Sequence, residues 1–346
     1  MANGIPGNNI LAVTFTNKAA NEMKERTQKL LAGHLEHFSM PAVGTFHSIC
    51  VRILRQEIEV LGQGYNSNYV IFDTDDSQKL LKLIMKDLRI DEKEIKVRGI
   101  QGMISKLKNN LTFPYDSGLN GILNDWFGGR MADVLQHIYP EYLKRLKDHN
   151  ALDFDDLLMK TVEVWEKHPE VLEKYRKRWQ HVMVDEYQDT NFVQYRMIRL
   201  LVDGHKNIGV VGDDYQSIYS FRGADFRNIL DFEKDFPEAT VVKLEQNYRS
   251  TGNILDSANT LIGHNKSGRK KNLWTEQGKG ERIKVQEVWD EKMEGNEIAE
   301  LIKHMLDGRH EGEYIPQSYS EIAILYRMNA QSRAIEEALM RNQIPY

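Results

Sequence analysis

Val182-Met183-Val184-Asp185-Glu186-Tyr187-Gln188-Asp189 is the strongest local signal in this sequence. Three apolar residues lead directly into two carboxylates, which is the pattern of a buried strand that ends at a ligand-binding edge of a sheet. Such a pair suits a Mg²⁺–nucleotide site, because Asp185 can hold the metal shell while Glu186 orients and deprotonates an attacking water. The alternative is an Asp-Glu pair that merely begins a helix, and the stretch by itself is compatible with both.

Other short apolar runs have the same character. Each is rich in Val, Ile, Leu or Phe, and most are followed at once by polar residues. They alternate with segments of helical periodicity, which predicts an α/β protein with a mostly parallel sheet. The predicted strands are Ile10–Phe15, Ala42–Phe46, His181–Val184, Ile208–Val211 and Val241–Leu244. A second region is expected beyond about Gly252, with strand-like segments Ile283–Trp289 and Glu321–Arg327 and helices near 298–305 and 331–341.

The composition is that of a soluble globular protein. The 346 residues include 46 Lys and Arg against 51 Asp and Glu, which gives a net charge of −5. At ~150 residues per domain, this length predicts about two domains. No run approaches the ~18 apolar residues of a membrane span, and the first residues lack a signal-peptide pattern, so we expect a cytoplasmic protein without membrane contact. The slightly acidic total argues against a protein that coats nucleic acid by bulk charge.

The single cysteine, Cys50, excludes an internal disulfide framework and a Cys-rich zinc site. We expect its side chain to be a small buried hydrophobe.

Between about Tyr69 and Asn150 the spacing becomes helical throughout, which indicates a helical insertion into the α/β domain. One helix is predicted after the capping residues Asp75-Asp76-Ser77, and two more carry apolar residues at 100–107 and 134–142. In the segment Leu152–Leu157 that follows, the carboxylates could bind a metal, but capping of a helix N-terminus is the simpler interpretation. The basic clusters Lys106/Lys108 and Lys266–Lys271 are weak evidence for nucleic-acid binding, because charge runs usually lie on solvated faces.

A later strand end combines amide, aromatic and arginine side chains. After Val210-Val211 come a glycine turn, the amide Gln216, and then Tyr219 and Phe221 beside Arg222. An amide near a terminal phosphate can report whether that phosphate is present. Aromatics next to an arginine suit stacking on single-stranded nucleic acid, at ~1–3 kcal/mol per stacked base. For each aromatic taken alone, the alternative is a place in the core.

Three further segments offer phosphate-binding groups. Tyr248 could stack on a base, and Arg249 could neutralise a transferring phosphoryl group or lie in a surface salt bridge. The strand ends Thr14–Ala20 and Gly44–Ser48 offer hydroxyls, an aromatic, a lysine and a histidine, groups that commonly hold a nucleic-acid backbone. His47 lies beside a serine, but no acidic partner for a triad is apparent, so we reject serine hydrolase chemistry.

The order and spacing of these segments together resemble the UvrD/PcrA/Rep group of superfamily 1 DNA helicases. Seven ordered segments, spread across almost the whole chain, carry the resemblance: TFTNKAANEM (14–23), GTFHSICVRIL (44–54), LDFDDLL (152–158), VDEYQDTN (184–191), VGDDYQSIYSFRGAD (211–225), LEQNYRST (244–251) and LYRMNAQSRAIEEAL (325–339).

The resemblance implies two RecA-like P-loop NTPase motor domains that use ATP and Mg²⁺ to move 3′ to 5′ along single-stranded DNA. Such a motor unwinds duplex junctions in DNA repair or replication. Residues 1–70 and 152–252 would form the first motor domain and 71–151 its inserted helical subdomain, while 253–346 would begin the second motor domain.

The resemblance also implies roles for individual residues. Asp185 would bind Mg²⁺, Glu186 would activate the hydrolytic water, and Gln216 would contact the γ-phosphate and couple it to DNA. Tyr248 would stack on adenine, and Arg249 would reach the γ-phosphate. The DNA path would be lined by Phe15, Thr16, Thr45, His47, Tyr219, Phe221 and Arg222. Phe221 stands where the family usually has Trp and keeps a stacking face of smaller area.

Some motifs of the family are missing from the sequence. No Gly-x-x-x-x-Gly-Lys-[Ser/Thr] phosphate loop occurs in it, and the C-terminal motifs, including the second motor domain's arginine, are also absent. Such a loop supplies the backbone amides and the lysine that hold the phosphates. We therefore expect this chain to be an incomplete, inactive copy of a helicase. The alternative is a catalytically silent module that binds single-stranded DNA or a partner.

Overall fold

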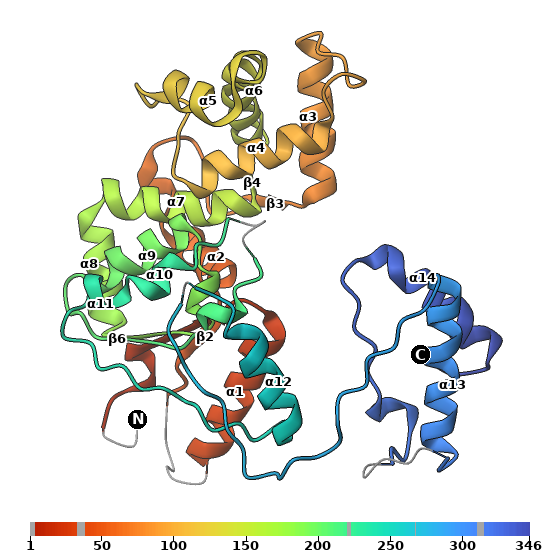
Figure 1. Cartoon of the computed structure of the whole chain (residues 1–346). Helices are drawn as coiled ribbons and strands as arrows, with labels where there is room; N and C mark the ends of the chain where they lie inside the picture. Colours follow the sequence, from red (N-terminus) through yellow and green to blue (C-terminus); the bar gives the residue numbers. More distant parts are fainter. Residues whose placement is uncertain (1–3, 33–38, 220–222, 267, 310–314) are drawn as a thin grey trace. The chain divides into compact units, whose positions relative to one another are not determined.

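The computed structural model describes residues 4–32, 39–219, 223–266, 268–309 and 315–346 (Figure 1). The chain divides into two compact units, Met1–Ala239 and Thr240–Tyr346. Phe221 and Arg222, two of the residues predicted to contact DNA, lie outside the described residues.

A four-stranded parallel sheet forms the centre of the first unit. Its order is β2 (Ala42–Thr45), β1 (Ile10–Thr14), β5 (His181–Val184) and β6 (Ile208–Val210). In the register, Val13 of β1 lies opposite Gly44 on one side and Val184 on the other. Four of the five strands predicted for the sheet are present within one residue of their expected ends. The predicted α/β class with a parallel sheet is therefore confirmed.

Helices cover this sheet and connect its strands. The bounds in this domain are α1 (Asn17–Ala32), α2 (Phe46–Glu57), α7 (Phe154–Lys167), α8 (Pro169–Arg178), α9 (Phe192–Val202), α10 (Arg227–Leu230) and α11 (Phe232–Asp235), with 3₁₀ turns η1 (Gly7–Asn9) and η2 (Ile58–Leu61). The core lies between the sheet, α2, α7 and α9, with Ile49, Ile53 and Trp165 buried in it. Cys50 is fully buried there, as predicted, and burial raises the pKa of its thiol to about 12.

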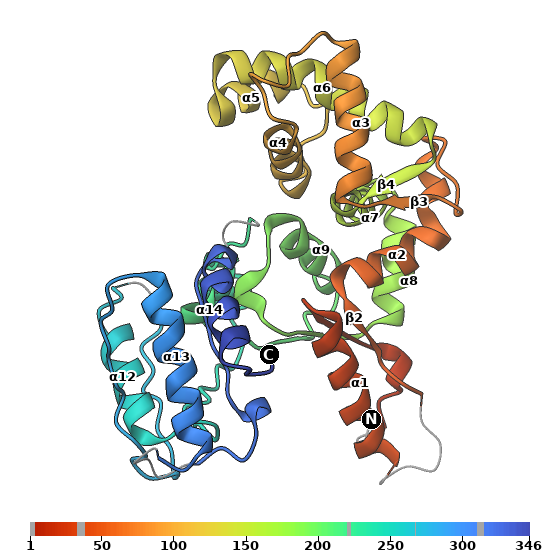
Figure 2. The same cartoon turned by 90° about the vertical axis from the view of Figure 1, so that its right-hand side faces the viewer.

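The helical insertion is present and has a core of its own. It contains α3 (Thr74–Asp87), α4 (Val97–Asn109), α5 (Leu119–Phe127) and α6 (Gly129–Asp148), which bury a cluster that includes Leu81, Ile100 and Leu135. A two-stranded parallel sheet of β3 (Val70–Phe72) and β4 (Ala151–Asp153) closes its base, where α7 begins (Figure 2). The cap of α3 is Asp73, which accepts the N–H of Asp76, and not the predicted Asp75-Asp76-Ser77.

The carboxylates where β4 ends and α7 begins cap α7, as predicted, and also hold a buried lysine. Asp153 and Asp156 form a reciprocal capping box at the start of α7. Lys108 Nζ lies 2.7 Å from Asp153 Oδ2 and 2.8 Å from Asp156 Oδ1, and the lysine is fully buried. The prediction of a solvated face is therefore wrong for Lys108, although Lys106 is exposed. The reason is that Lys108 follows Ile100 and Ile104 at a spacing of four, on the buried face of α4.

One ammonium neutralises only one of the two carboxylates. Burial tends to raise the pKa of Asp153, but the ion pair with Lys108 lowers this pKa below its ordinary value. Burial and the charge of Asp153 raise the pKa of Asp156 to about 7. The charge of Lys108 is thus matched mainly by Asp153, and this buried pair joins the helical insertion to the domain of the four-stranded sheet.

Replacing Lys108 by Met is expected to destabilise the first unit by about 3–5 kcal/mol, because it leaves the buried Asp153 carboxylate without its counter-ion. Urea denaturation followed by circular dichroism measures the loss. Lys106→Met on the exposed side of the same turn is the matched control and should change stability by no more than ~0.5 kcal/mol. Equal effects of the two substitutions would contradict this account of α4.

The second unit contains α12 (Gly252–Ile262), α13 (Glu291–Leu306), the turn η6 (Tyr319–Glu321) and α14 (Asn329–Arg341). Its small core consists of side chains from α13, α14 and the segment after α14: Ala299, Ile302, Ile335, Leu339 and Ile344. Gly295 allows the close approach of α13 to α14, since a Cβ there would lie 2.8 Å from the Ala334 carbonyl oxygen. The helices predicted near 298–305 and 331–341 are confirmed.

Three predicted strands are not formed in the described part of this unit. Val241–Leu244, Ile283–Trp289 and Glu321–Arg327 lie outside any ladder, and the pairing recorded is one isolated bridge between Gln246 and Trp274. Most of their apolar side chains are exposed, with Val285 at 93% and Leu325 at 89%, while Ile322 and Ile324 are partly buried against the small core of this unit. A strand exists only through hydrogen bonds to a neighbour, so an apolar run without a paired neighbour does not become one.

Among the helices of the described ranges, none combines the length and the apolar character needed to cross a membrane.

Candidate functional site

The carboxylate pair lies in a tight turn at the carboxyl end of β5. The backbone N–H of Asp185 donates to the Val13 carbonyl oxygen of β1 at 2.9 Å. Glu186 adopts a left-handed conformation, with φ 53° and ψ 41°, before the 3₁₀ turn η3 (Tyr187–Asp189). Burial, followed by the charge of Glu186, raises the pKa of Asp185. Glu186 is thus a non-glycine residue in a strained backbone conformation, which is common at functional sites. Its carboxylate repels that of Asp185, and a bound cation would relieve this repulsion.

Gln188 connects this turn to the end of β6. Its Nε2 donates to Glu186 Oε2 at 2.9 Å, and its Oε1 accepts the N–H of Asp213 at 3.0 Å. The side chain is buried, with 1% exposure. Gly212 makes room for it, since a Cβ at this position would lie 2.5 Å from Gln188 Oε1. Sequence reasoning missed Gln188; an amide next to a carboxylate pair, with a glycine at the neighbouring strand end, was the available signal.

Gln216 continues the chain of hydrogen bonds. It belongs to the 3₁₀ turn η4 (Asp214–Gln216), and its Nε2 donates to Asp213 Oδ2 at 2.9 Å. Hydrogen bonds thus connect Glu186 to Gln188, Gln188 to the backbone N–H of Asp213, and the Asp213 side chain to Gln216 along the carboxyl edge of the sheet. The predicted residues Asp185, Glu186 and Gln216 therefore lie at one edge of the sheet, and Gln216 is exposed there.

Gly212→Ala is expected to lower the stability of the first unit by about 1–3 kcal/mol, because the added methyl overlaps the Gln188 amide and the Ile229 side chain. Gly209→Ala, three residues earlier on β6, is the matched control, since nothing lies within 4 Å of a Cβ there. Thermal unfolding of the two variants beside the parent chain measures the difference. Comparable shifts in Tm would mean that Gly212 is not a close-packing position.

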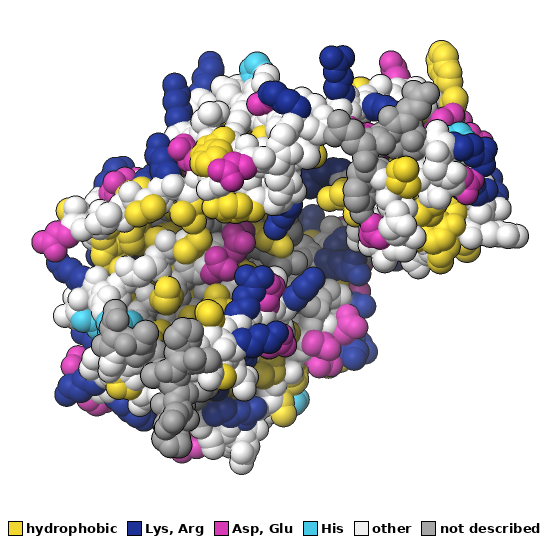
Figure 3. Space-filling model, turned by 90° about the horizontal axis from the view of Figure 1, so that it is seen from below, with side chains coloured by type: hydrophobic (Ala, Val, Ile, Leu, Met, Phe, Trp, Pro, Cys, Tyr) yellow, Lys and Arg dark blue, Asp and Glu magenta, His cyan; other side chains and the backbone are white. Residues whose placement is uncertain are grey.

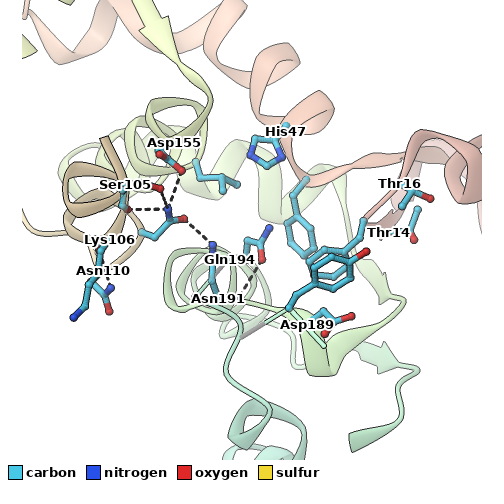
Figure 4. Close-up of a pocket in the computed structure, with 17 residues that line it drawn as sticks. Thr14, Thr16, His47, Ser105, Lys106, Asn110, Asp155, Asp189, Asn191 and Gln194 are labelled. Carbon is cyan, nitrogen blue, oxygen red and sulfur yellow. Dashed lines mark hydrogen bonds between the residues drawn. The ribbon is translucent and has the colours of Figure 1, made fainter. Parts of the chain in front are cut away.

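A pocket of about 670 Å³ lies beside this turn in the first unit (Figure 4). Figure 4 shows Ser105 and Lys106 of α4, with Asn110 directly after this helix, on one side of the pocket and Thr14 and Thr16 at the end of β1 on the other. Four of the residues predicted to contact DNA line this pocket: Phe15, Thr16, His47 and Tyr219. The helical insertion and the sheet domain therefore share one pocket, which the sequence did not reveal.

Packing fixes the side chains on the sheet side of the pocket. Phe15 meets Phe46 edge to face, with ring centroids 5.6 Å apart. Thr16 Oγ1 accepts the N–H of Ala19 at 3.1 Å at the start of α1. Burial lowers the pKa of His47, so its imidazole is neutral at pH 7 and offers a hydrogen bond rather than a charge.

Phe154 is a further aromatic that sequence reasoning did not single out. Its ring lies 5.9 Å from that of His47, edge to face, and half of its surface is exposed, at 50%. The available signal was an aromatic at the first position of α7, outside the apolar positions that form the buried face of this helix. By contrast, Thr45 does not line the pocket; its Oγ1 accepts the N–H of Ser48 at 3.2 Å and caps α2.

The charge around the pocket is mixed. Among the described residues that line it, Lys106 is the one lysine or arginine, and its Nζ lies 4.6 Å from the centre of the Trp126 ring. Two carboxylates, Asp155 and Asp189, also line the pocket. Burial raises the pKa of Asp155 to about 6, and burial together with the charge of Glu186 raises the pKa of Asp189. On the face seen in Figure 3, basic and acidic side chains are also interspersed. This pocket suits stacking and hydrogen bonding more than bulk attraction of phosphates.

Tyr248 and Arg249 belong to the second unit. Tyr248 is 74% exposed, and its hydroxyl donates to Gln246 Oε1 at 2.7 Å. Asn247 Oδ1 accepts the N–H groups of Arg249 and Ser250, which forms the turn before α12. The Arg249 side chain is exposed and has no ion pair within the described ranges. Both residues are accessible to a ligand of this unit.

The parallel sheet, with a carboxylate pair after one strand and an amide after the next, defines a RecA-like α/β protein. The chain belongs to the UvrD/REP helicase family: the profile of the UvrD/REP helicase N-terminal domain matches residues 1–237, and that of the UvrD-like helicase C-terminal domain matches residues 242–346. This confirms the resemblance found in the sequence.

Two proteins similar to this chain are ATP-dependent DNA helicases. The chain is 45% identical over 339 residues to the ATP-dependent DNA helicase PcrA of Staphylococcus aureus strain Mu50. The aligned region covers 98% of this chain and 44% of that helicase. The same figures hold for the ATP-dependent DNA helicase PcrA of Staphylococcus epidermidis strain ATCC 12228. The chain therefore spans less than half the length of these relatives.

Proposed function

We propose that this chain is part of an ATP-dependent helicase that moves 3′ to 5′ along single-stranded DNA and opens duplex junctions in repair or replication. We place such a protein in the cytoplasm. The observation that carries the proposal is the adjacency, within one unit, of the carboxylate turn at Asp185-Glu186 and the pocket lined by Phe15, His47 and Tyr219. That adjacency suits an enzyme in which occupancy of a DNA pocket affects nucleotide hydrolysis.

The residues at the sheet edge fit the metal end of a Mg²⁺–nucleotide. Asp185 and Glu186 are adjacent carboxylates, and burial raises the pKa of Asp185, so its charged form gains from a nearby cation. In the described ranges, no group of three His, Cys, Asp or Glu residues could hold a metal. A Mg²⁺ ion here would need phosphate oxygens as further ligands, which is how it usually binds in nucleotide sites.

The chain's own residues then have distinct tasks. When bound, Mg²⁺–ATP supplies the phosphoryl group and the positive charge that polarises it. Asp185 would hold the metal, and Glu186 Oε1 or Oε2 would accept the proton of the attacking water. Gln188 holds Glu186 through one carboxylate oxygen, which orients it. Gln216 would contact the γ-phosphate, while Tyr248 and Arg249 of the second unit would contact the adenine and the γ-phosphate.

A single strand would lie in the pocket through stacking and polar contacts. Phe15 and Tyr219 line it, Phe154 is exposed next to His47, and we propose that bases stack on these rings. Thr16 and neutral His47 offer polar groups for the backbone, and Lys106 offers one cation. We propose that Thr45, Phe221 and Arg222 also contact DNA, on the basis of the family resemblance alone.

Glu186→Gln is expected to lower the rate of DNA-stimulated ATP hydrolysis by about 100-fold or more, since it removes the base while keeping the hydrogen bond from Gln188. Because the sequence contains no phosphate loop, the assay uses two proteins: residues 1–346, and the same residues continued upstream through such a loop. Hydrolysis is expected in the longer protein. If the longer protein hydrolyses no ATP, or if Glu186→Gln leaves its rate unchanged, the enzymatic proposal fails.

Tyr219→Ala is expected to weaken binding of an oligothymidylate 12-mer by about 5- to 150-fold, which corresponds to the loss of ~1–3 kcal/mol of stacking on one base. Fluorescence anisotropy at a fixed salt concentration measures the affinity of residues 1–346. Phe192→Ala is the control, because Phe192 is 46% exposed in the same unit but does not line the pocket. Unchanged affinity in Tyr219→Ala would remove the pocket from the DNA path.

A further inference from the structure

Two buried asparagines join the helical insertion to the segment that follows the carboxylate turn. Asn191 Nδ2 donates to Asn109 Oδ1 at 2.7 Å, and Asn109 Nδ2 donates to Asp155 Oδ1 at 2.8 Å. Exposure is 9% for Asn109 and 8% for Asn191. One amide at the end of α4 therefore connects the starts of α7 and α9, and all three residues line the pocket (Figure 4).

Asn191 is fixed independently of this contact. Its Oδ1 accepts the N–H of Gln194, and Gln194 Oε1 accepts the Asn191 N–H, a reciprocal capping box at the start of α9. The carboxamide nitrogen is therefore left to Asn109 while the oxygen caps the helix. A buried amide with both ends used is costly to disturb, because each group that loses its partner stays dehydrated.

The neighbour of Asn191 connects to the carboxylate turn. Thr190 Oγ1 donates to the Tyr187 carbonyl oxygen at 2.7 Å, and the N–H of Asp189 donates to the Glu186 carbonyl oxygen at 2.9 Å. Asn228 Nδ2 donates to both oxygens of Thr190 at 3.0 Å, which ties in the segment after β6. From Tyr187 to Asn191 each residue is buried. A displacement of Asn191 thus moves a short, closely packed segment that begins at Glu186.

We propose that Asn109 and Asn191 are positioning residues through which the α4 wall of the pocket and the carboxylate turn at Glu186 move together. Nucleic acid entering between α4 and the sheet domain would press on α4, and the Asn109–Asn191 hydrogen bond would carry the displacement to the turn. The inference rests on the proposed function, since it takes the pocket as the DNA site. It adds a specific connection from that site to the residue assigned to water activation.

Asn191→Asp is the most selective test. The aspartate keeps an oxygen to accept the N–H of Gln194 and so keeps the cap of α9, but it loses the N–H that Asn109 accepts. Asn124→Asp on α5 is the matched control in the same helical insertion, because Asn124 is exposed, does not line the pocket, and its amide donates to the Asn120 carbonyl oxygen. Both variants change an asparagine to an aspartate and add one negative charge.

Hydrogen exchange followed by mass spectrometry on residues 1–346 measures the connection. Without DNA, Asn191→Asp is expected to speed exchange of the amides in 186–191 about fivefold, and to leave the core peptide 49–54 unchanged. In the parent chain, an oligothymidylate 12-mer is expected to slow exchange in both 104–110 and 186–191. In Asn191→Asp the protection should persist in 104–110 and disappear from 186–191, while Asn124→Asp behaves as the parent.

The outcomes separate the two proposals. Protection of 186–191 that survives in Asn191→Asp, or faster exchange throughout the unit including 49–54, would overturn the positioning role, since the second result indicates a merely structural loss. If the parent chain fails to bind the oligonucleotide by anisotropy, the pocket as DNA site is overturned together with this inference. If the parent binds and only the protection pattern is wrong, the inference fails and the proposed function stands.

Discussion

Parallel pairing of β5 between β1 and β6 is the constraint on which the first unit depends. Parallel strands all end at the same edge of a sheet, so the segments that follow them meet there even though they are far apart in the chain. Here that edge gathers Thr14–Thr16, Asp185-Glu186 and the segment from Gly212 to Gln216. The left-handed conformation of Glu186 and the close approach at Gly212 follow from bringing two such segments together around the Gln188 side chain.

Buried polar contacts attach the helical insertion to this sheet domain. Lys108 is held by Asp153 and Asp156, and Asn109 contacts Asp155 and Asn191. An apolar contact would tolerate sliding, whereas ion pairs and amide bonds in a dehydrated interior are satisfied in one geometry only. The polar interface therefore fixes where α4 lies relative to β1, and with it the pocket between them.

Much of the first unit could be predicted from the sequence. Strand positions, the capping role of the carboxylates at the start of α7, the buried Cys50 and three of the four helices of the insertion all follow from local patterns that the structure preserves, whereas α5 was not predicted. The second unit was predicted less well, because Val241–Leu244, Ile283–Trp289 and Glu321–Arg327 have strand-like composition but no paired neighbours in the described residues. Lys108 was misjudged for a related reason, since the charge of a residue does not show which face of its helix is covered.

The sequence by itself determined the family, the strand ends that carry Asp185, Glu186 and Gln216, and the residue types that suit nucleotide and single-strand chemistry. Those properties are local, because they depend on residue identity and order along the chain. Only the tertiary structure decided that Gln188 holds Glu186, that Thr45 caps α2 and does not line the pocket, and that Asn109 of the insertion contacts Asn191. The Asn109–Asn191 contact joins residues 82 positions apart, and Gln188 also accepts the N–H of Asp213, 25 positions away; such long-range contacts are set by which faces of the folded elements meet.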